Sequence, residues 1–361
     1  MGPLPNKMKA MVTMGHGGLE KIVFRDDWPI PDIKAGEVLI HVRACGLNNT
    51  DINTRTGWYS KTVSHATTGD AFEEAGEEDP SWGGKPITFP RIQGADVCGE
   101  IVAVGTGINP SRIGQRVITD GWIRNPNEPF NKSKTGYFGS ECDGGFADYA
   151  AIPSSNALSI ESNLTDAELA TFSCSYATAE GMLNRADVSE EDVVLIPGAS
   201  GGVGGALVQL AKRRKAKVIA LASVEKHKDV IWLGADQVLP RSPEKIKAIL
   251  KEEKITVVAD VVGGKIWRDL VDVLERGGRY VCSGAIAGPI VDLDLRTLYL
   301  RDLSFHGSTV LDPQVTIDLV KYIETGQIKP CLAATFKLRE LREAQKTFIA
   351  KKHTGNIVVT T

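Results

Sequence analysis

Cysteine is scarce and scattered in this sequence of 361 residues. The six cysteines form no Cys-x-x-Cys pair and are too sparse for a disulfide framework; they stand at positions 45, 98, 142, 174, 282 and 331. Each is by default a small buried apolar residue. A fold held together by disulfides is therefore not expected.

Long apolar runs and a strong bias of charge are missing as well. Residues 1–10 contain no apolar core of signal-peptide length, and no later segment reaches about 18 uninterrupted apolar residues. The net charge is only -3 and the basic residues are spread along the chain, so a stripe that tracks phosphates is not expected. We therefore expect a cytoplasmic protein without a nucleic-acid or membrane partner.

What the sequence has is enough length for two domains. Hydrophobic residues make up 42% of the chain and charged residues 24%, and the 37 glycines fit a globular protein with many tight turns. The one biased segment, residues 67–84, is acidic and polar. It lies within a stretch, residues 61–86, that we expect to form an exposed loop at the mouth of a cleft.

The first third of the chain has the alternation of β-strands. Along residues 38–44 the apolar side chains of Val38, Ile40 and Val42 share one face, and His41 lies on the other. Shorter runs follow at residues 100–104 and 116–118, between glycines and prolines. This part predicts a β-rich barrel or sandwich with antiparallel strands.

From about residue 165 helices and strands alternate. Thr165 and Glu168 form a capping pair that begins a helix running to about residue 183. Strands and helices then alternate, with strands at 192–196, 217–222, 255–262 and 280–283 and helices at 202–214, from 242 and at 266–275. This spacing gives right-handed βαβ units and a parallel sheet, so the fold class is α/β. After residue 310 we expect one or two helices and a terminal strand at 355–360 that could return to the first domain.

A glycine-rich loop lies between the first of these strands and its helix. In such a loop, glycines permit a tight turn, let backbone N–H groups approach a pyrophosphate, and allow the helix to pack closely on the strand. Ala199 replaces the first glycine of the usual G-x-G-x-x-G. The alternative is a glycine-rich turn without a ligand. The residues predicted to contact a dinucleotide are Ala199, Ser200, Gly201, Gly202, Val203 and Gly204, together with Gly284 after the strand at 280–283.

The end of the second strand indicates which dinucleotide is bound. An NAD site places a carboxylate there for the ribose hydroxyls, but residues 221–224 contain none. Ser223 can donate to a 2′-phosphate and Lys226 can neutralise it, which favours NADPH. Both could instead be ordinary surface residues, and Glu225 could still serve NAD if the turn has another shape.

Four stretches resemble the medium-chain dehydrogenase/reductases, over nearly the whole chain. They are G-A-S-G-G-V-G at 198–204, G-A-D-V-C-G-E-I-V-A-V-G at 94–105, G-Q-R-V at 114–117 and G-G-F-A-D-Y at 144–149. The sequence looks most like the branch of quinone oxidoreductases and enoyl reductases. The resemblance implies a GroES-like catalytic domain formed by residues 1–165 and 306–361, a Rossmann domain formed by 166–305, an active site between them and a homodimer.

The metal ligands of the zinc-dependent relatives are absent. Those enzymes bind catalytic zinc with a Cys, a His and a second Cys, but the first two positions correspond here to Asn48 and Ala95. Only Cys174 stands at a ligand position, and the cysteine cluster of the family's structural zinc is missing. We therefore predict no metal. A rearranged site formed by Asp96, Cys98 and Cys174 is the alternative.

Without a Lewis acid, an activated double bond or a quinone is an easier hydride acceptor than a simple carbonyl. Residues 48–59 are similar to the N-x-x-D-x-N-x-x-x-G-x-Y of enoyl thioester reductases, which implies that Tyr59 donates a proton or binds the oxyanion. Asn48 would direct its amide toward the nicotinamide or substrate, Thr50 occupies a proton-relay position, and Thr178 would contact the nicotinamide. Tyr59 could instead be a loop aromatic, and Asn48 could simply anchor its loop.

The predicted function is NADPH-dependent, metal-free hydride transfer to a quinone or an α,β-unsaturated carbonyl. The enzymatic alternative is a zinc-type alcohol dehydrogenase, which a metal assay would distinguish. A dinucleotide-binding protein with little catalysis, like the crystallin relatives of this branch, is the third possibility.

Overall fold

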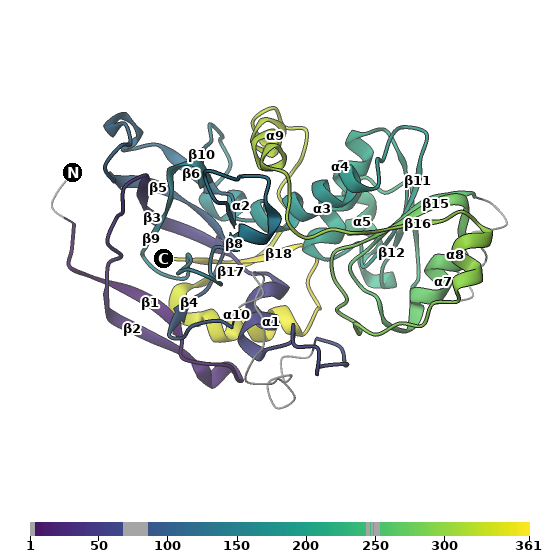
Figure 1. Cartoon of the computed structure of the whole chain (residues 1–361), viewed down its shortest axis with the longest axis horizontal. Coiled ribbons are helices and arrows are strands. Elements are labelled where there is room, and N and C mark those ends of the chain that lie inside the picture. The colour runs from purple at the N-terminus through teal and green to yellow at the C-terminus, as the bar shows by residue number, and fades with distance from the viewer. Residues whose placement is uncertain (1–3, 68–85, 243–245, 247, 249–252) are drawn as a thin grey trace.

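The computed structural model describes residues 4–67, 86–242, 246, 248 and 253–361. The described chain forms a β-rich catalytic domain and a Rossmann domain, which lie side by side with α3 (Ser173–Arg185) between them (Figure 1). The acidic loop predicted at 67–84 lies, apart from Thr67, outside the described residues, and so does most of the helix predicted from residue 242. No described helix is both long and apolar enough to cross a bilayer.

The catalytic domain is built around a sheet in which the strand order is β10-β6-β5-β3-β18-β17, with β9 also paired to β3. A smaller sheet has the order β2-β1-β4, and β7 pairs with β8. The strands are β1 (Lys7–Thr13), β2 (Ile22–Pro29), β3 (Glu37–Gly46), β4 (Arg91–Ile92), β5 (Asp96–Val104), β6 (Arg116–Thr119), β7 (Trp122–Ile123), β8 (Gly136–Tyr137), β9 (Tyr149–Pro153), β10 (Ala157–Ser159), β17 (Leu332–Lys337) and β18 (Asn356–Thr360).

The alternation predicted at residues 38–44 is present in β3 only in part. Leu39 on the outer face is buried as well, and a break in register after Val42 places Ala44 in a different buried cluster. Val38, Ile40 and Val42 are fully buried in the core of the catalytic domain, while Arg43 is exposed. His41 lies on the other face and its ring stacks on Tyr149 of the neighbouring strand β9. The alternation follows from burial of one face of an antiparallel sheet.

Segments from both ends of the sequence belong to this domain. β18 pairs antiparallel with β3 and parallel with β17, so the terminal strand returns to the first domain as the sequence predicts (Figure 1). The helices of the domain are α1 (Asn49–Thr56), α2 (Asp166–Leu169) and α10 (Leu341–Ile349).

The Rossmann domain contains a parallel sheet with the strand order β13-β12-β11-β14-β15-β16. Because all these strands run in one direction, their carboxyl ends meet at one edge, where ligands of doubly wound sheets bind. Its strands are β11 (Val193–Pro197), β12 (Lys217–Leu221), β13 (Gln237–Leu239), β14 (Ile255–Asp260), β15 (Leu274–Cys282) and β16 (Ser304–Gly307), and its helices are α3, α4 (Gly202–Arg213), α5 (His227–Trp232), α7 (Trp267–Asp272), α8 (Leu295–Leu300) and α9 (Pro313–Glu324).

Two predicted helices are shorter than expected. The capping pair is present, since the Thr165 N–H donates to the Glu168 carboxylate, but the helix it begins ends at Leu169 and α3 starts anew at Ser173. The helix predicted at 266–275 ends at Asp272, because Leu274 joins β15 and pairs with Ile255. In the second case sheet pairing outweighs local helix propensity.

The predicted domain boundary at residue 306 falls within β16. Gly307 still pairs in the Rossmann sheet, and the following helix α9 packs against α3. The chain re-enters the catalytic sheet at β17. One buried cluster joins the domains, because α3 side chains such as Tyr176 pack with Ala44 of the catalytic sheet and Val194 of the Rossmann sheet.

Candidate functional site

The glycine-rich loop of residues 198–204, named the phosphate loop after the ligand that the sequence predicts for it, lies at the carboxyl end of β11 and begins α4. Gly198 has a left-handed φ of 67°, and a Cβ on Gly204 would stand 2.2 Å from the carbonyl oxygen of Gly198. Only a residue without a side chain allows the helix to approach the turn this closely. Ala199 is fully buried, whereas Gly201 is exposed. The first N–H groups of a helix lack partners within it, so this loop offers the donors that a pyrophosphate requires.

The C-terminal segment lies against this loop. The Gly355 N–H donates to the carbonyl oxygen of Ser200 at 2.9 Å, and Gly355 forms a β-bridge with Gly201. Thr354 donates its hydroxyl to Asp229 of α5 at 2.7 Å. The segment that leads into β18 of the catalytic domain is thus fastened to the phosphate loop of the Rossmann domain.

Ser223 and Lys226, which follow β12, have different surroundings in the structure. Ser223 is half-buried and hydrogen-bonds to the exposed carboxylate of Glu225, which contributes to lowering the pKa of Glu225. Lys226 is buried, and its ammonium donates to the carbonyl oxygens of Lys351 at 2.7 Å and His353 at 2.6 Å.

Arg241, just beyond β13, was missed by sequence reasoning. It is exposed, and its charge reaches both Glu225 and Lys226, contributing to the lowered pKa of each. No local pattern distinguishes this arginine from any other surface arginine, because its position near Glu225 and Lys226 depends on the pairing of β12 with β13.

Asn48 precedes α1 and is fixed by two carboxylates. Its backbone N–H donates to Asp51 at 2.8 Å, and its side-chain Nδ2 donates to Asp96 at 3.0 Å. The other carboxylate oxygen of Asp96 accepts the Cys174 N–H at 2.8 Å. The amide of Asn48 is therefore held in one orientation between the catalytic sheet and α3, and part of its donor capacity is used by Asp96.

Both carboxyl groups are buried. Burial raises the pKa of Asp51 to about 7 against the lowering effect of hydrogen bonds from the Asn48 and Gly94 backbones. Burial raises the pKa of Asp96 to about 7 as well, and the nearby charge of Asp51 adds to this rise. Each carboxyl is therefore partly protonated at neutral pH. In the structure both groups hold Asn48, and Asp96 also holds the start of α3 through the Cys174 N–H.

Tyr59 lies just after α1, where the domains meet. It packs, with Ala285 of the Rossmann domain, against the buried pair Trp58 and Val63. Burial raises the pKa of Tyr59 to about 12, although hydrogen bonds with Thr50 and Asn53 act in the opposite direction. The phenol is therefore protonated at neutral pH.

The structure thus brings Tyr59 and Thr50 together. It also puts Tyr59 close to the loop that follows β15, where the predicted cofactor residue Gly284 is half-buried. A backbone hydrogen bond also joins the two domains here, because the Thr67 N–H donates to the carbonyl oxygen of Ile286 at 3.0 Å.

Cys174 and Thr178 stand one turn apart on α3. Burial raises the pKa of the Cys174 thiol strongly, and its hydrogen-bond partners are Tyr137 and Thr178. Cys174 therefore stays a neutral thiol. Tyr137 was not predicted, since nothing local in the sequence links it to Cys174. It packs edge-on against Trp122, and both rings are buried in the cluster that joins the two domains.

The positions that correspond to the zinc ligands of the zinc-dependent relatives, Asn48, Ala95 and Cys174, do not form a set of metal ligands. Asn48 donates to Asp96, Ala95 is buried and apolar, and the thiol of Cys98 donates to Asp166 at 3.5 Å. Across the described residues no three His, Cys, Asp or Glu side chains gather as a metal site would require. The rearranged site formed by Asp96, Cys98 and Cys174 does not fit this geometry.

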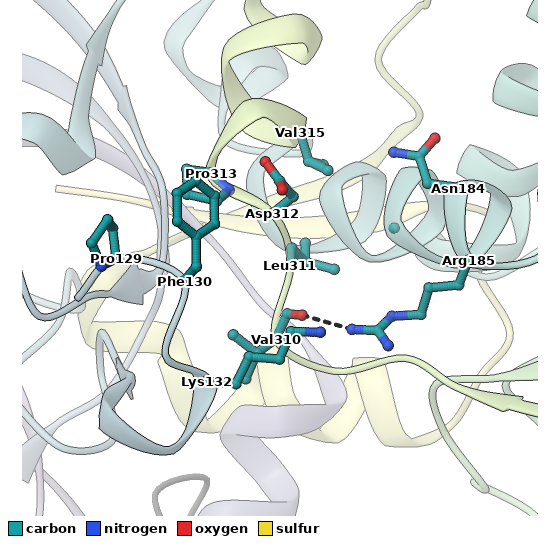
Figure 2. Close-up of a pocket in the computed structure, with 11 residues that line it drawn as sticks. Pro129, Phe130, Lys132, Asn184, Arg185, Val310, Leu311, Asp312, Pro313 and Val315 are labelled. Atoms are coloured by element: carbon teal, nitrogen blue, oxygen red, sulfur yellow. Dashed lines mark hydrogen bonds between the residues drawn. The ribbon is translucent and has the colours of Figure 1, made fainter.

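A pocket of about 290 Å³ lies elsewhere, between the catalytic domain and α3 and α9 (Figure 2). The Arg185 side chain points across it and donates to the carbonyl oxygen of Val310 at 3.0 Å. No predicted site residue lines it. Its walls are Pro129, Phe130, Lys132, Gly181, Asn184, Arg185, Val310, Leu311, Asp312, Pro313 and Val315.

A doubly wound sheet with a glycine-rich loop, joined to a β-rich domain, is the architecture of dinucleotide-dependent oxidoreductases. Residues 34–162 match the alcohol dehydrogenase GroES-like domain, and residues 202–325 match the zinc-binding dehydrogenase family. The chain belongs to the medium-chain dehydrogenase/reductase superfamily, in its branch of quinone oxidoreductases and enoyl reductases, as the sequence motifs predict.

The relatives carry different activities in their names. The acryloyl-coenzyme A reductase of Metallosphaera sedula is 28% identical, over 98% of this chain and 100% of its own length. Human quinone oxidoreductase is 26% identical, over 95% and 94%. The solved structure of a proposed alcohol dehydrogenase from Sinorhizobium meliloti 1021 is 43% identical with a TM-score of 0.91, over 99% of this chain and 97% of that one.

Proposed function

We propose that this protein uses NADPH to reduce an activated C=C bond of an α,β-unsaturated carbonyl, or a quinone, without a metal. The observation that carries the proposal is the protonated phenol of Tyr59, held beside Thr50 where α1 meets the loop after β15. A hydride acceptor of this kind develops negative charge on oxygen, and a phenol can stabilise that charge or donate a proton. The named activities of the two reductase relatives are of this class.

The fit between the residues and a nicotinamide dinucleotide supports the same proposal. The dinucleotide, when bound, supplies the hydride. The loop from Ser200 to Gly204 would hold its pyrophosphate, and Thr178 and Gly284 would contact the nicotinamide. Tyr59 would hold the proton at its phenol oxygen, with Thr50 positioned to exchange it, and Asn48 would shape the wall behind the substrate.

NADPH is proposed over NADH because of charge. β12 ends at Leu221 without a carboxylate, and the charge of the exposed Arg241 acts on Glu225 and Lys226 just beyond it. The Glu225 carboxylate, which hydrogen-bonds Ser223, is the group that would serve NADH instead. The positive charge of Lys226 would attract the 2′-phosphate from a distance, or its ammonium would release the carbonyl oxygen of Lys351 or His353 and bind the phosphate directly.

Metal independence is supported by the donor set at the family's zinc positions, an amide, a methyl group and a neutral thiol. The name of the 43% identical structure keeps a zinc-type alcohol dehydrogenase as the second candidate. The two are separated by a metal assay on purified protein together with the effect of a chelator. One tightly bound zinc per chain, required for turnover, would establish the second candidate.

The test of Tyr59 compares Tyr59→Phe with Tyr149→Phe, whose ring stacks on His41 of β3. NADPH oxidation is followed with quinones, enones and enoyl thioesters. We expect Tyr59→Phe to lower kcat by about 100-fold with NADPH affinity retained, and the control to behave as the wild type. Equal turnover in both variants would refute the proton-donor role. Binding of NADPH without turnover of any of these substrates would favour a cofactor-binding protein instead.

A homodimer formed through the Rossmann sheets is also proposed. β16 is the outermost strand of the sheet as described, and the segment before it exposes Ile290, Leu295, Tyr299 and Leu300. An open strand edge beside exposed apolar side chains is a common association surface. Light scattering after gel filtration should give twice the chain mass, and Leu295→Glu should shift it to the monomer. Localisation in the cytoplasm stays a prediction.

A further inference from the structure

A line of buried polar side chains joins the phosphate loop to Asn48. Asn356, at the start of β18, is 2% exposed, and its Nδ2 donates to the hydroxyl of Ser175 at 2.8 Å. The Ser175 hydroxyl, 1% exposed, in turn faces the Asn48 Oδ1 at 3.5 Å. Asn48 then donates to Asp96 at 3.0 Å. Four chain segments far apart in the sequence contribute to this line.

The line touches the place where a pyrophosphate would bind. A Cβ on Gly202, the first residue of α4, would lie 2.6 Å from the Ser175 Oγ and 2.8 Å from the Asn356 Nδ2. The two side chains therefore pack directly on the helix N-terminus. The Oδ1 of Asn356 is buried and has no hydrogen-bond partner among the described residues, a cost that buried amides rarely carry without a reason.

The directions of the hydrogen bonds are consistent along the line. The Ser175 hydroxyl accepts from Asn356 and has one proton, and in the described part of the chain that proton points to the Asn48 Oδ1. At 3.5 Å this second contact is long for a hydroxyl–carbonyl bond, so a small shift of α3 or of the loop would either strengthen or break it. A displacement of Gly202 would therefore reach the amide of Asn48 through Ser175.

We propose that Ser175 is a positioning residue that couples dinucleotide binding at the phosphate loop to the orientation of Asn48. The proposal rests on the proposed dinucleotide binding but not on the identity of the substrate. Linkage is reciprocal, so a change at Asn48 must alter affinity for the dinucleotide through Ser175.

The experiment measures the NADPH dissociation constant by titration without substrate, which needs no turnover. The variants are Ser175→Ala, Asn48→Ser and the double variant, where Asn48→Ser keeps a helix-capping hydroxyl. We expect each single variant to weaken NADPH binding about fivefold. In the Ser175→Ala background we expect Asn48→Ser to have little further effect.

The matched control is Ser173→Ala on the same helix. Ser173 is 6% exposed and its hydroxyl has no partner within the described part of the chain, so its removal should change the dissociation constant less than twofold. Thermal melting of every variant monitors folding. Additive effects of the Ser175 and Asn48 changes, or a Ser175→Ala that behaves as Ser173→Ala does, overturn the coupling while leaving the proposed function intact. Wild-type protein that binds no NADPH overturns both.

Discussion

The ammonium of Lys226 donates to the carbonyl oxygen of Lys351 at 2.7 Å, across 125 residues of sequence. Lys226 belongs to the Rossmann domain and Lys351 to the segment that follows α10 of the catalytic domain. The same ammonium also donates to the carbonyl oxygen of His353. A lysine predicted to bind a phosphate is therefore also a link between the two domains.

This double role gives a prediction for Lys226→Met. If the ammonium also serves a 2′-phosphate, the variant should weaken NADPH binding about tenfold more than NADH binding, since a charge-assisted contact is lost only with NADPH. The measurement is the ratio of the two dissociation constants. Equal weakening of both would assign Lys226 to the interdomain link alone, and Arg241→Met in parallel shows how much of the preference that exposed cation supplies.

Gly202 should not tolerate a side chain. In Gly202→Ala the new methyl group would stand within 3 Å of Ser175 and Asn356, so the helix N-terminus must move away from them. We expect dinucleotide affinity to fall by at least about tenfold with little loss of folding. The control is Gly15→Ala, because no atom lies within 4 Å of a Cβ at Gly15. Wild-type affinity in Gly202→Ala would contradict this packing.

The buried carboxyl of Asp96 predicts a pH dependence of stability. Its pKa is about 7 in the folded chain and 3.8 when exposed, so between these values the folded state binds more protons than the unfolded state. Its contribution to the free energy of unfolding therefore falls as pH rises from about 4 to about 7 and then levels off. The free energy of unfolding, measured by urea titration at several pH values in this range, should fall less steeply with pH in Asp96→Asn than in the wild type. Part of the slope should remain because Asp51 behaves in the same way.

Arg55 is predicted to be structural. Its side chain is 1% exposed, and its guanidinium donates to Gln345 of α10 at 3.1 Å and to the carbonyl oxygen of Gly17. Arg55→Ala leaves both acceptors without this donor and creates a cavity, which should cost about 3 kcal/mol. Urea unfolding measures the loss. Arg25→Ala, which removes an exposed ion pair with Asp27, should leave the midpoint unchanged.

The Rossmann half was the easier part to predict. β11, α4, β12 and β14 follow from local periodicity, and the glycines of residues 198–204 indicate a turn between strand and helix, whereas β13, β16, α5 and α8 were not predicted. Errors came where partners are distant. The local sequence predicts that Leu274 belongs to a helix, but its pairing with Ile255 places it in a strand. The hydrogen bonds from Asn356 through Ser175 to Asn48 cannot be predicted from the residues around any one of them.

The sequence by itself determined the fold class and the position of the glycine-rich loop between β11 and α4, because these depend on residue type and short-range spacing. Only the tertiary structure decided what Asn48 and Lys226 touch. Their partners Asp96 and Lys351 lie 48 and 125 residues away. Which distant groups a buried amide or ammonium meets is set by how sheets and helices pack, and no stretch of sequence around either residue encodes it.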